Sequence, residues 1–119
     1  MAEGFELGQY GFQKYHSDPK PARTERLRLL GEAADLSSAR KGSTIAEAVR
    51  LARDLCNEPA AGKSPEALAQ LVDEMGSTLG LRVRIYDEED IGNERFGALA
   101  GVAAGAHTPA RLVEVWYEP

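Results

Sequence analysis

Apolar residues recur with the spacing of one helix face between residues 44 and 56. Thr44, with Glu47 three residues later, matches a capping box, in which a hydroxyl and a carboxylate close the start of a helix. The apolar positions behind it are Ile45, Ala48, Val49, Ala52, Leu55 and Cys56. The pattern predicts an amphipathic helix that starts at Thr44 and ends before Pro59, because the residue before a proline is pushed out of the helical region.

A second helix is predicted after a short loop of small residues at positions 60–63. Ser64, Pro65 and Glu66 supply a hydroxyl cap, a proline at the first helical position and an acid in the first turn. The apolar positions that follow keep helical spacing: Leu68, Leu71, Val72, Met75 and Leu79. Gly80 is placed to end this helix in the left-handed conformation.

Two later segments have the patterns of strands. Residues 81–86, which read LRVRIY, alternate apolar and polar residues, as half-buried strands do. Residues 111–117, which read RLVEVWY, are rich in β-branched and aromatic residues, which favour strand. Asp87–Asp90 can cap a short helix between them, and a further short strand is predicted at residues 26–30. The order helix, strand, short helix, strand favours an α/β layer in which parallel strands are joined by helices.

Three other segments carry weaker patterns. Residues 4–15 mix aromatic residues with glycine, and a short helix is favoured there over a strand, with a proline-bearing turn at residues 17–21. Residues 31–42 are small and polar, with Asp35 or Ser37 as a cap for a single helical turn. Residues 97–105 are small and glycine-rich, so we expect the backbone there to pass very close to another part of the protein.

The composition is that of an ordinary folded domain, with 43% hydrophobic and 28% charged residues in a chain of 119. The net charge of −5 argues against non-specific binding to nucleic acid. The single cysteine excludes an internal disulfide and fits a reducing compartment, most simply the cytoplasm. No apolar run reaches the roughly 18 residues of a membrane span.

Side chains that often bind metals or act as nucleophiles are present but do not form a recognisable motif. His16 and His107 lie far apart in the sequence and are interpreted as solvated loop residues. Asp87–Asp90 lacks the residue order of a calcium loop and is interpreted as a solvated helix start. Cys56 lies on the apolar stripe and is interpreted as a small hydrophobic residue rather than a nucleophile.

Three further features have both a structural and a functional interpretation. Ser64 is explained as a helix cap, and the glycines of residues 97–105 match no phosphate-binding fingerprint, which favours close packing. Arg82 and Arg84, with Tyr86, could form a basic strand face for an anion or a partner, or simply the solvent side of a strand. No residue is therefore assigned a catalytic, cofactor-binding or metal-binding role.

Several segments resemble, in the right order, the leucyl aminopeptidase (cytosol aminopeptidase) family. A family helix that ends in A-R-D-L-V-N-x-P is matched by ARDLCNEP at residues 52–59, and T-P-x-x-L-A by SPEALA at residues 64–69. The strand V-x-V-x-D-x-x-x-L is matched by residues 83–91, and G-A-L-L-x-V by GALAGV at residues 97–102. The family's P-P-R-L-V-x-L-x-Y is similar to PARLVEVWY at residues 109–117.

The likeness extends to the start of the chain, with local departures. Residues 4–20 are similar to the stretch before the last strand of the family's N-terminal domain. Residues 103–106 read AAGA where the family has G-Q-G-S, Ala61 stands where asparagine is common, and Phe96 where methionine is frequent. These departures concern the geometry of loops.

The resemblance implies a peptidase that releases N-terminal residues, leucine among the favoured ones, from peptide substrates. It implies two divalent metal ions, zinc or manganese, that polarise the carbonyl and activate a bridging water, and assembly as a hexamer. The family's metal ligands and its catalytic lysine and arginine come later in the sequence than the segments matched here. The resemblance therefore assigns no catalytic or metal-binding residue to this chain.

We expect an α/β fragment of such an enzyme. Residues 1–42 would be the C-terminal part of an N-terminal α/β domain, residues 43–58 an interdomain linker helix, and residues 59–119 the truncated first part of an α/β/α catalytic domain. Such a fragment is expected to be inactive alone, to bind no cofactor itself, and to have no membrane or nucleic-acid partner. The alternatives are a non-enzymatic interaction or regulatory module, or a small-ligand binder that uses residues 97–105.

Overall fold

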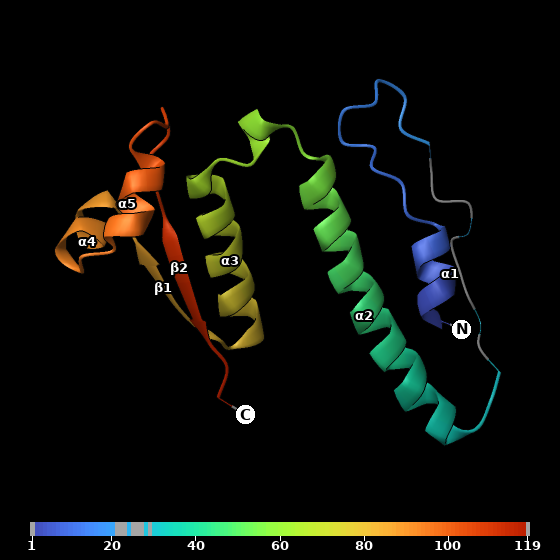
Figure 1. Ribbon diagram of the computed structural model, residues 1–119. Helices are drawn as coiled ribbons and strands as arrows, with labels where there is room; N and C mark the ends of the chain where they lie inside the picture. Colours follow the sequence, from blue (N-terminus) through green and yellow to red (C-terminus); the bar gives the residue numbers. More distant parts are fainter. Residues whose placement is uncertain (1, 21–23, 25–27, 29, 119) are drawn as a thin grey trace. The chain divides into compact units, whose positions relative to one another are not determined.

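The computed structural model describes residues 2–20, 24, 28 and 30–118, and it forms two compact units, Met1–Glu58 and Pro59–Pro119 (Figure 1). Unit 1 contains the helices α1 (Ala2–Gly8) and α2 (Ala33–Asn57). Unit 2 contains a short 3₁₀ turn, three helices and two strands.

The two helices of unit 1 pack through small residues. Ala2 and Ala46 are buried, and a Cβ added to Gly42 would lie 3.3 Å from the backbone nitrogen of Glu3. Ser43 also donates a hydrogen bond from its hydroxyl to the Glu6 carboxylate. Because none of these α2 side chains is large, the backbone of α1 can approach α2 closely.

The predicted helix start at Thr44 is wrong, because α2 already begins at Ala33. The Thr44 hydroxyl donates instead to the backbone carbonyl of Arg40, at 3.2 Å, as hydroxyls in helix interiors often do. The residues before Thr44 include alanine, leucine, arginine and lysine, which favour helix. The helix therefore extends in the N-terminal direction past Thr44. Its predicted end before Pro59 is confirmed, since α2 ends at Asn57.

The apolar stripe predicted on α2 is not the face that packs on α1. Ile45 is 41% exposed, Cys56 is exposed, and the most buried position is Ala46. Cys56, interpreted as a small hydrophobic residue of the stripe, is therefore not buried in this structure. Helix α2 packs on α1 through the face on which the two backbones can come closest. Gly42 and Ala46 allow a closer approach than the larger residues of the stripe.

The weaker predictions for unit 1 have mixed outcomes. The helix favoured for residues 4–15 covers only Ala2–Gly8, and residues 9–20 continue through turns. The single helical turn predicted within residues 31–42 is instead the first part of α2. Most of the strand predicted at residues 26–30 lies outside the described residues.

Unit 2 follows the predicted order of elements with one helix more. The elements are the turn η1 (Ala60–Gly62), α3 (Pro65–Leu79), β1 (Arg82–Tyr86), α4 (Glu88–Asn93), α5 (Gly97–Ala103) and β2 (Leu112–Trp116). The ends predicted for α3 are confirmed: the Ser64 side chain accepts a hydrogen bond from the Ala67 amide, and Gly80 is left-handed with φ of 68°. The predicted helix start at Asp87–Asp90 is also confirmed, as a reciprocal capping box of α4.

The two strands pair in antiparallel register, from Arg82 opposite Trp116 to Tyr86 opposite Leu112. The expectation of parallel neighbours is wrong for this pair. Helices α4 and α5 are six and seven residues long, or about 10 Å each, whereas a five-residue strand spans about 17 Å. They contact each other and the end of β1 instead of running back along the sheet, so the chain returns in the opposite direction.

Helices lie on both faces of this small sheet, which confirms the α/β class (Figure 1). On one face, Gly76 of α3 lies so close to Val83 that a Cβ added to the glycine would clash with the valine methyl. On the other face, Tyr86, Ile91 and Ala110 form a buried core, with Leu99, Ala103 and Leu112 packed against it. Phe96 meets the Tyr86 ring edge-on, with 5.9 Å between ring centroids.

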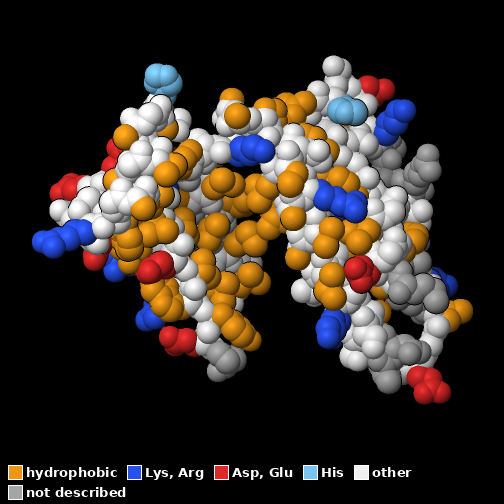
Figure 2. All heavy atoms as spheres, in the orientation of Figure 1, with side chains coloured by type: hydrophobic (Ala, Val, Ile, Leu, Met, Phe, Trp, Pro, Cys, Tyr) orange, Lys and Arg blue, Asp and Glu red, His pale blue; other side chains and the backbone are white. Residues whose placement is uncertain are grey.

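One sequence expectation about packing in unit 2 is wrong. A Cβ added at Gly97, Gly101 or Gly105 would meet nothing within 4 Å, so the small residues there make no close approach. The apolar pattern of α3 correctly predicted a helix; Leu71, Val72 and Met75 are half-buried, Leu79 is 64% exposed, and the buried residues are Ala69 and Gly76. Figure 2 shows hydrophobic side chains that reach the surface on the face drawn.

Candidate functional site

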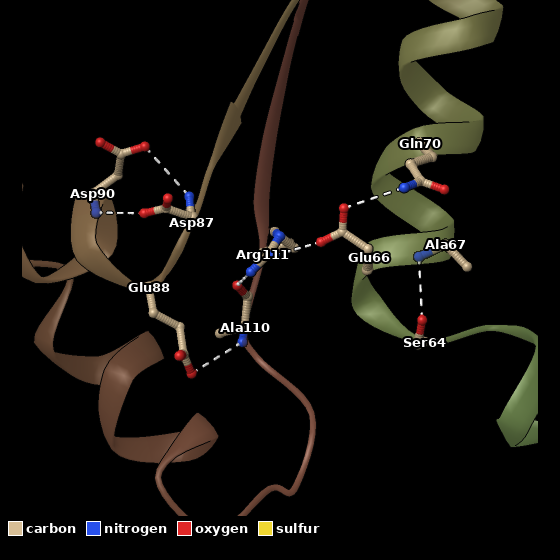
Figure 3. Close-up of polar contacts among 9 residues, drawn as sticks. All are labelled: Ser64, Glu66, Ala67, Gln70, Asp87, Glu88, Asp90, Ala110 and Arg111. Carbon is tan, nitrogen blue, oxygen red and sulfur yellow. Dashed lines mark hydrogen bonds and ion pairs between the residues drawn. The ribbon is translucent and has the colours of Figure 1, made fainter.

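A polar cluster joins the start of α3 to the start of β2 (Figure 3). The Arg111 guanidinium forms an ion pair with the Glu66 carboxylate and donates to the Ala110 carbonyl at 2.8 Å. The second Glu66 oxygen accepts from the Gln70 side-chain amide at 3.3 Å. Since the Arg111 side chain is only 20% exposed, this contact restrains the first turn of α3 against β2.

The acidic residues at the start of α4 accept hydrogen bonds from backbone amides, one of which lies just before β2 (Figure 3). The Glu88 carboxylate accepts from the Ala110 amide at 3.4 Å. Asp87 accepts from the Asp90 amide at 2.9 Å, and the Asp90 carboxylate accepts from the Asp87 amide at 3.4 Å. Three of the four carboxylates in the predicted acidic run thus bind backbone amides, which supports the interpretation of the run as a helix start.

The outer part of β1 pairs each arginine with an aromatic ring and an acid. The Arg82 guanidinium lies 4.5 Å from the Trp116 ring centroid, and that of Arg84 lies 4.0 Å from the Tyr86 centroid. Glu118 and Glu94 lie 3.5 Å from Arg82 and Arg84 respectively. These acids offset the positive charge, so the geometry favours a solvated strand face over an anion site.

Tyr86, the last residue of β1, is part of the buried core. Its hydroxyl donates to the Glu114 carboxylate at 2.8 Å. This hydrogen bond, with partial burial, raises the pKa of the Tyr86 phenol. The phenol therefore acts as a donor to Glu114 at neutral pH.

In unit 1, a polar cluster joins residues 10–15 to the end of α2. The Tyr10 hydroxyl donates to Asp54 at 2.7 Å and accepts from the Asn57 side-chain amide at 3.1 Å. The Arg53 guanidinium lies 5.3 Å from the Tyr10 ring centroid. Partial burial and the hydrogen bond to Asp54 raise the pKa of the Tyr10 phenol.

One turn further along, the Glu58 carboxylate binds two side chains. It accepts from the Lys14 ammonium at 2.9 Å and from the Tyr15 hydroxyl. The hydrogen bond to Glu58 raises the pKa of both Lys14 and Tyr15. Glu58 is only 8% exposed, so these partners offset the desolvation of its charge.

Sequence reasoning missed this cluster. Its members are separated by more than 40 positions, for example 44 between Tyr10 and Asp54. The sequence does show a tyrosine-bearing segment and polar residues at the end of a predicted helix. No spacing rule indicates that these two segments contact each other.

The other candidate residues lie in three different segments. His16 is exposed in the loop after α1, and His107 is exposed between α5 and β2 in the other unit. Cys56 is exposed in the last turn of α2. Among residues 2–20, 24, 28 and 30–118, no three histidine, cysteine, aspartate or glutamate side chains are placed to hold a metal ion. The described residues therefore do not fit a two-metal centre.

None of the helices in the described residues combines the length and the apolar character that crossing a bilayer requires.

Comparison with known proteins assigns the family. The model of the cytosol aminopeptidase family, catalytic domain, matches residues 50–119. The chain belongs to the cytosol aminopeptidase family. The resemblance carried by residues 52–59, 64–69 and the later segments is thereby confirmed.

Curated cytosol aminopeptidases align with the whole chain. A probable cytosol aminopeptidase of Persephonella marina is 33% identical over 100% of this chain and 25% of its own length, and one of Aquifex aeolicus is 34% identical over 100% and 24%. One of Mycobacterium marinum is 37% identical over 95% of this chain and 22% of its own. This chain thus spans about a quarter of the length of these relatives.

Two solved structures resemble the chain. The bottromycin maturation enzyme BotP in complex with Mn matches with a TM-score of 0.85 and 32% identity, over 99% of this chain and 24% of BotP. A second BotP structure matches with the same TM-score at 31% identity.

Proposed function

We propose that this chain is part of a leucyl-aminopeptidase-type metallopeptidase that releases N-terminal amino acids from peptides in the cytoplasm. The observation that carries the proposal is the match of residues 50–119 to the catalytic domain of the cytosol aminopeptidase family. The names of the curated relatives support the peptidase activity and the cytoplasmic location. The assignment of residues 1–42, 43–58 and 59–119 to three parts of such an enzyme stays a prediction.

Within that enzyme, the residues described here would serve as scaffold. The Arg111–Glu66 ion pair, the Glu88–Ala110 hydrogen bond and the core around Ile91 hold α3, α4 and β2 together. Dependence on manganese is supported by the Mn complex of BotP, and zinc is the alternative that the family resemblance implies. Because no described cluster fits a metal, the ligands would come from the part of the enzyme outside this chain.

The chain alone is therefore expected to be inactive. Purified chain and the Aquifex aeolicus relative, each with manganese, would be compared on leucine p-nitroanilide at equal concentration. We expect hydrolysis by the relative and only the no-protein rate with this chain. Hydrolysis that rises in proportion to the concentration of this chain and stops on chelation of the metal would contradict the proposal.

We also propose that the whole enzyme is a homo-oligomer, a hexamer by the family resemblance, without a nucleic-acid partner. The net charge of −5 on this chain supports the second part for the segment in hand, because a polyanion would be repelled by it. Sedimentation of the chain with and without duplex DNA at low salt tests it. Co-sedimentation that weakens as salt is raised would contradict it.

A further inference from the structure

Residues 9–20, here called the strap, lie against the C-terminal end of α2 (Figure 1). Three strap side chains make the contacts, namely Tyr10, Lys14 and Tyr15. Each contact ends on one of the last residues of the helix or on the residue that follows it: Asp54, Asn57 and Glu58. The strap also has internal order, since the Gln13 side chain accepts from the Lys20 amide at 2.5 Å.

The end of α2 is a place where outside contacts are needed. The last four carbonyls of a helix have no partner within it, and a cation near this end is favourable because the helix dipole leaves it negative. The last turn of α2 contains no basic residue. Lys14 brings a positive charge to this end from the strap, and Glu58 is the carboxylate that receives it.

The backbone hydrogen bonds show where the helical pattern of α2 ends, next to the residues that the strap contacts. The Glu58 amide donates to the Asp54 carbonyl at 2.9 Å, which extends the helical hydrogen-bond pattern to the position before Pro59. Proline has no amide hydrogen, so the pattern cannot be carried through it. Helix ends open more readily than helix interiors, and contacts from outside the helix can raise the free energy of that opening.

The strap and the helix end belong to different parts of the family match. The family model begins at residue 50, so Asp54, Asn57 and Glu58 lie inside the matched region and the strap lies outside it. We propose that the strap is a device that keeps the last turn of α2 helical, so that release of the strap unravels residues 54–58. This inference stands on contacts within unit 1 and does not depend on the proposed peptidase function.

The test removes only the two strap hydroxyls. In the Tyr10→Phe/Tyr15→Phe variant of the full chain, amide hydrogen exchange of residues 55–58 should become about fivefold faster, because two hydrogen bonds to carboxylates are lost. Exchange of residues 43–49, in the middle of α2, should be unchanged. The matched control is Tyr117→Phe, which removes an exposed phenol in unit 2 and should alter neither region.

A second variant tests the charge. Lys14→Gln removes the cation and keeps a side chain of similar length, and it should accelerate exchange at the same four amides. Unchanged exchange at residues 55–58 in both variants would overturn the proposal. Acceleration spread evenly over α1 and α2 would overturn it too, since the contacts would then stabilise unit 1 as a whole rather than the helix end.

Discussion

Unit 1 and unit 2 bury their helices in different ways. In unit 1, α1 and α2 meet through Ala2, Gly42 and Ala46, and the contacts at the far end of α2 are polar. In unit 2, a core around Tyr86 and Ile91 accompanies the close contact of Gly76 with Val83. We conclude that unit 2 depends mainly on apolar packing, whereas unit 1 depends on close backbone approach and on hydrogen bonds to carboxylates.

The comparison also shows what a helical pattern of large apolar residues can predict. In both α2 and α3 the pattern locates a helix, but the most buried positions are small ones, Ala46 in α2 and Ala69 and Gly76 in α3. Small side chains let two backbones approach, and this proximity then determines the contact face. Large residues of the pattern, such as Ile45 and Leu79, remain exposed.

The largest expected effect comes from the core of unit 2. Ile91 is 2% exposed, so Ile91→Ala should lower the free energy of unfolding of unit 2 by about 3 kcal/mol through lost burial and a cavity. Denaturant unfolding followed by the fluorescence of Trp116, the single tryptophan, measures this unit. Val102→Ala, at an exposed site in α5, is the control and should change the value by less than about 0.5 kcal/mol. Equal effects of the two substitutions would refute the apolar-core description.

A smaller effect is expected at the contact between α3 and β1. Gly76→Ala places a methyl group against Val83 and should destabilise unit 2 by about 2 kcal/mol through overpacking. Gly92→Ala is the matched control within α4, where an added Cβ meets nothing within 4 Å. Because alanine favours helix more than glycine, the control should be neutral or slightly stabilising by up to about 1 kcal/mol. A Gly76→Ala protein as stable as Gly92→Ala would show that the close approach is not maintained in solution.

The smallest expected effect is a difference between the two units in how their stability depends on pH. Tyr10 and Tyr15 have pKa values raised above 10.0, and Lys14 has one raised above 10.5, so the folded state of unit 1 holds these protons more tightly than the unfolded state. That stabilisation is complete below about pH 10 and is lost as pH rises through the folded-state values. Tyr86 is the corresponding group in unit 2.

The measurement compares the two units between about pH 9 and pH 11. Hydrogen exchange of α2, corrected for the intrinsic pH dependence of exchange, should show a larger loss of stability than Trp116 fluorescence shows for unit 2. The loss should be reduced in Tyr10→Phe/Tyr15→Phe, which lacks the titrating phenols. An equal loss in both units, unaffected by that double substitution, would contradict the role of the phenol–carboxylate contacts.

Much of unit 2 could be predicted from local sequence. Ser64 and Gly80 mark the two ends of α3, and Asp87 with Asp90 marks the start of α4, because these signals act between residues that are at most a few positions apart. The alternation in residues 81–86 and the β-branched and aromatic residues of 111–117 predicted the two strands for the same reason. The ordered family segments predicted the family, since several short motifs at correct spacing rarely coincide by chance.

Only the tertiary structure decided which faces meet. The antiparallel pairing of β1 with β2, the close approach of Gly76 to Val83 and the binding of Glu58 by Lys14 and Tyr15 all join residues that the sequence separates. Such contacts depend on how backbones of particular length and bulk fit together, and no periodicity within one segment records that. The sequence by itself thus determined the ends of α3, the start of α4, the two strands and the family. The fold determined the start and packing of α2, the exposure of Cys56 and the contacts of the strap.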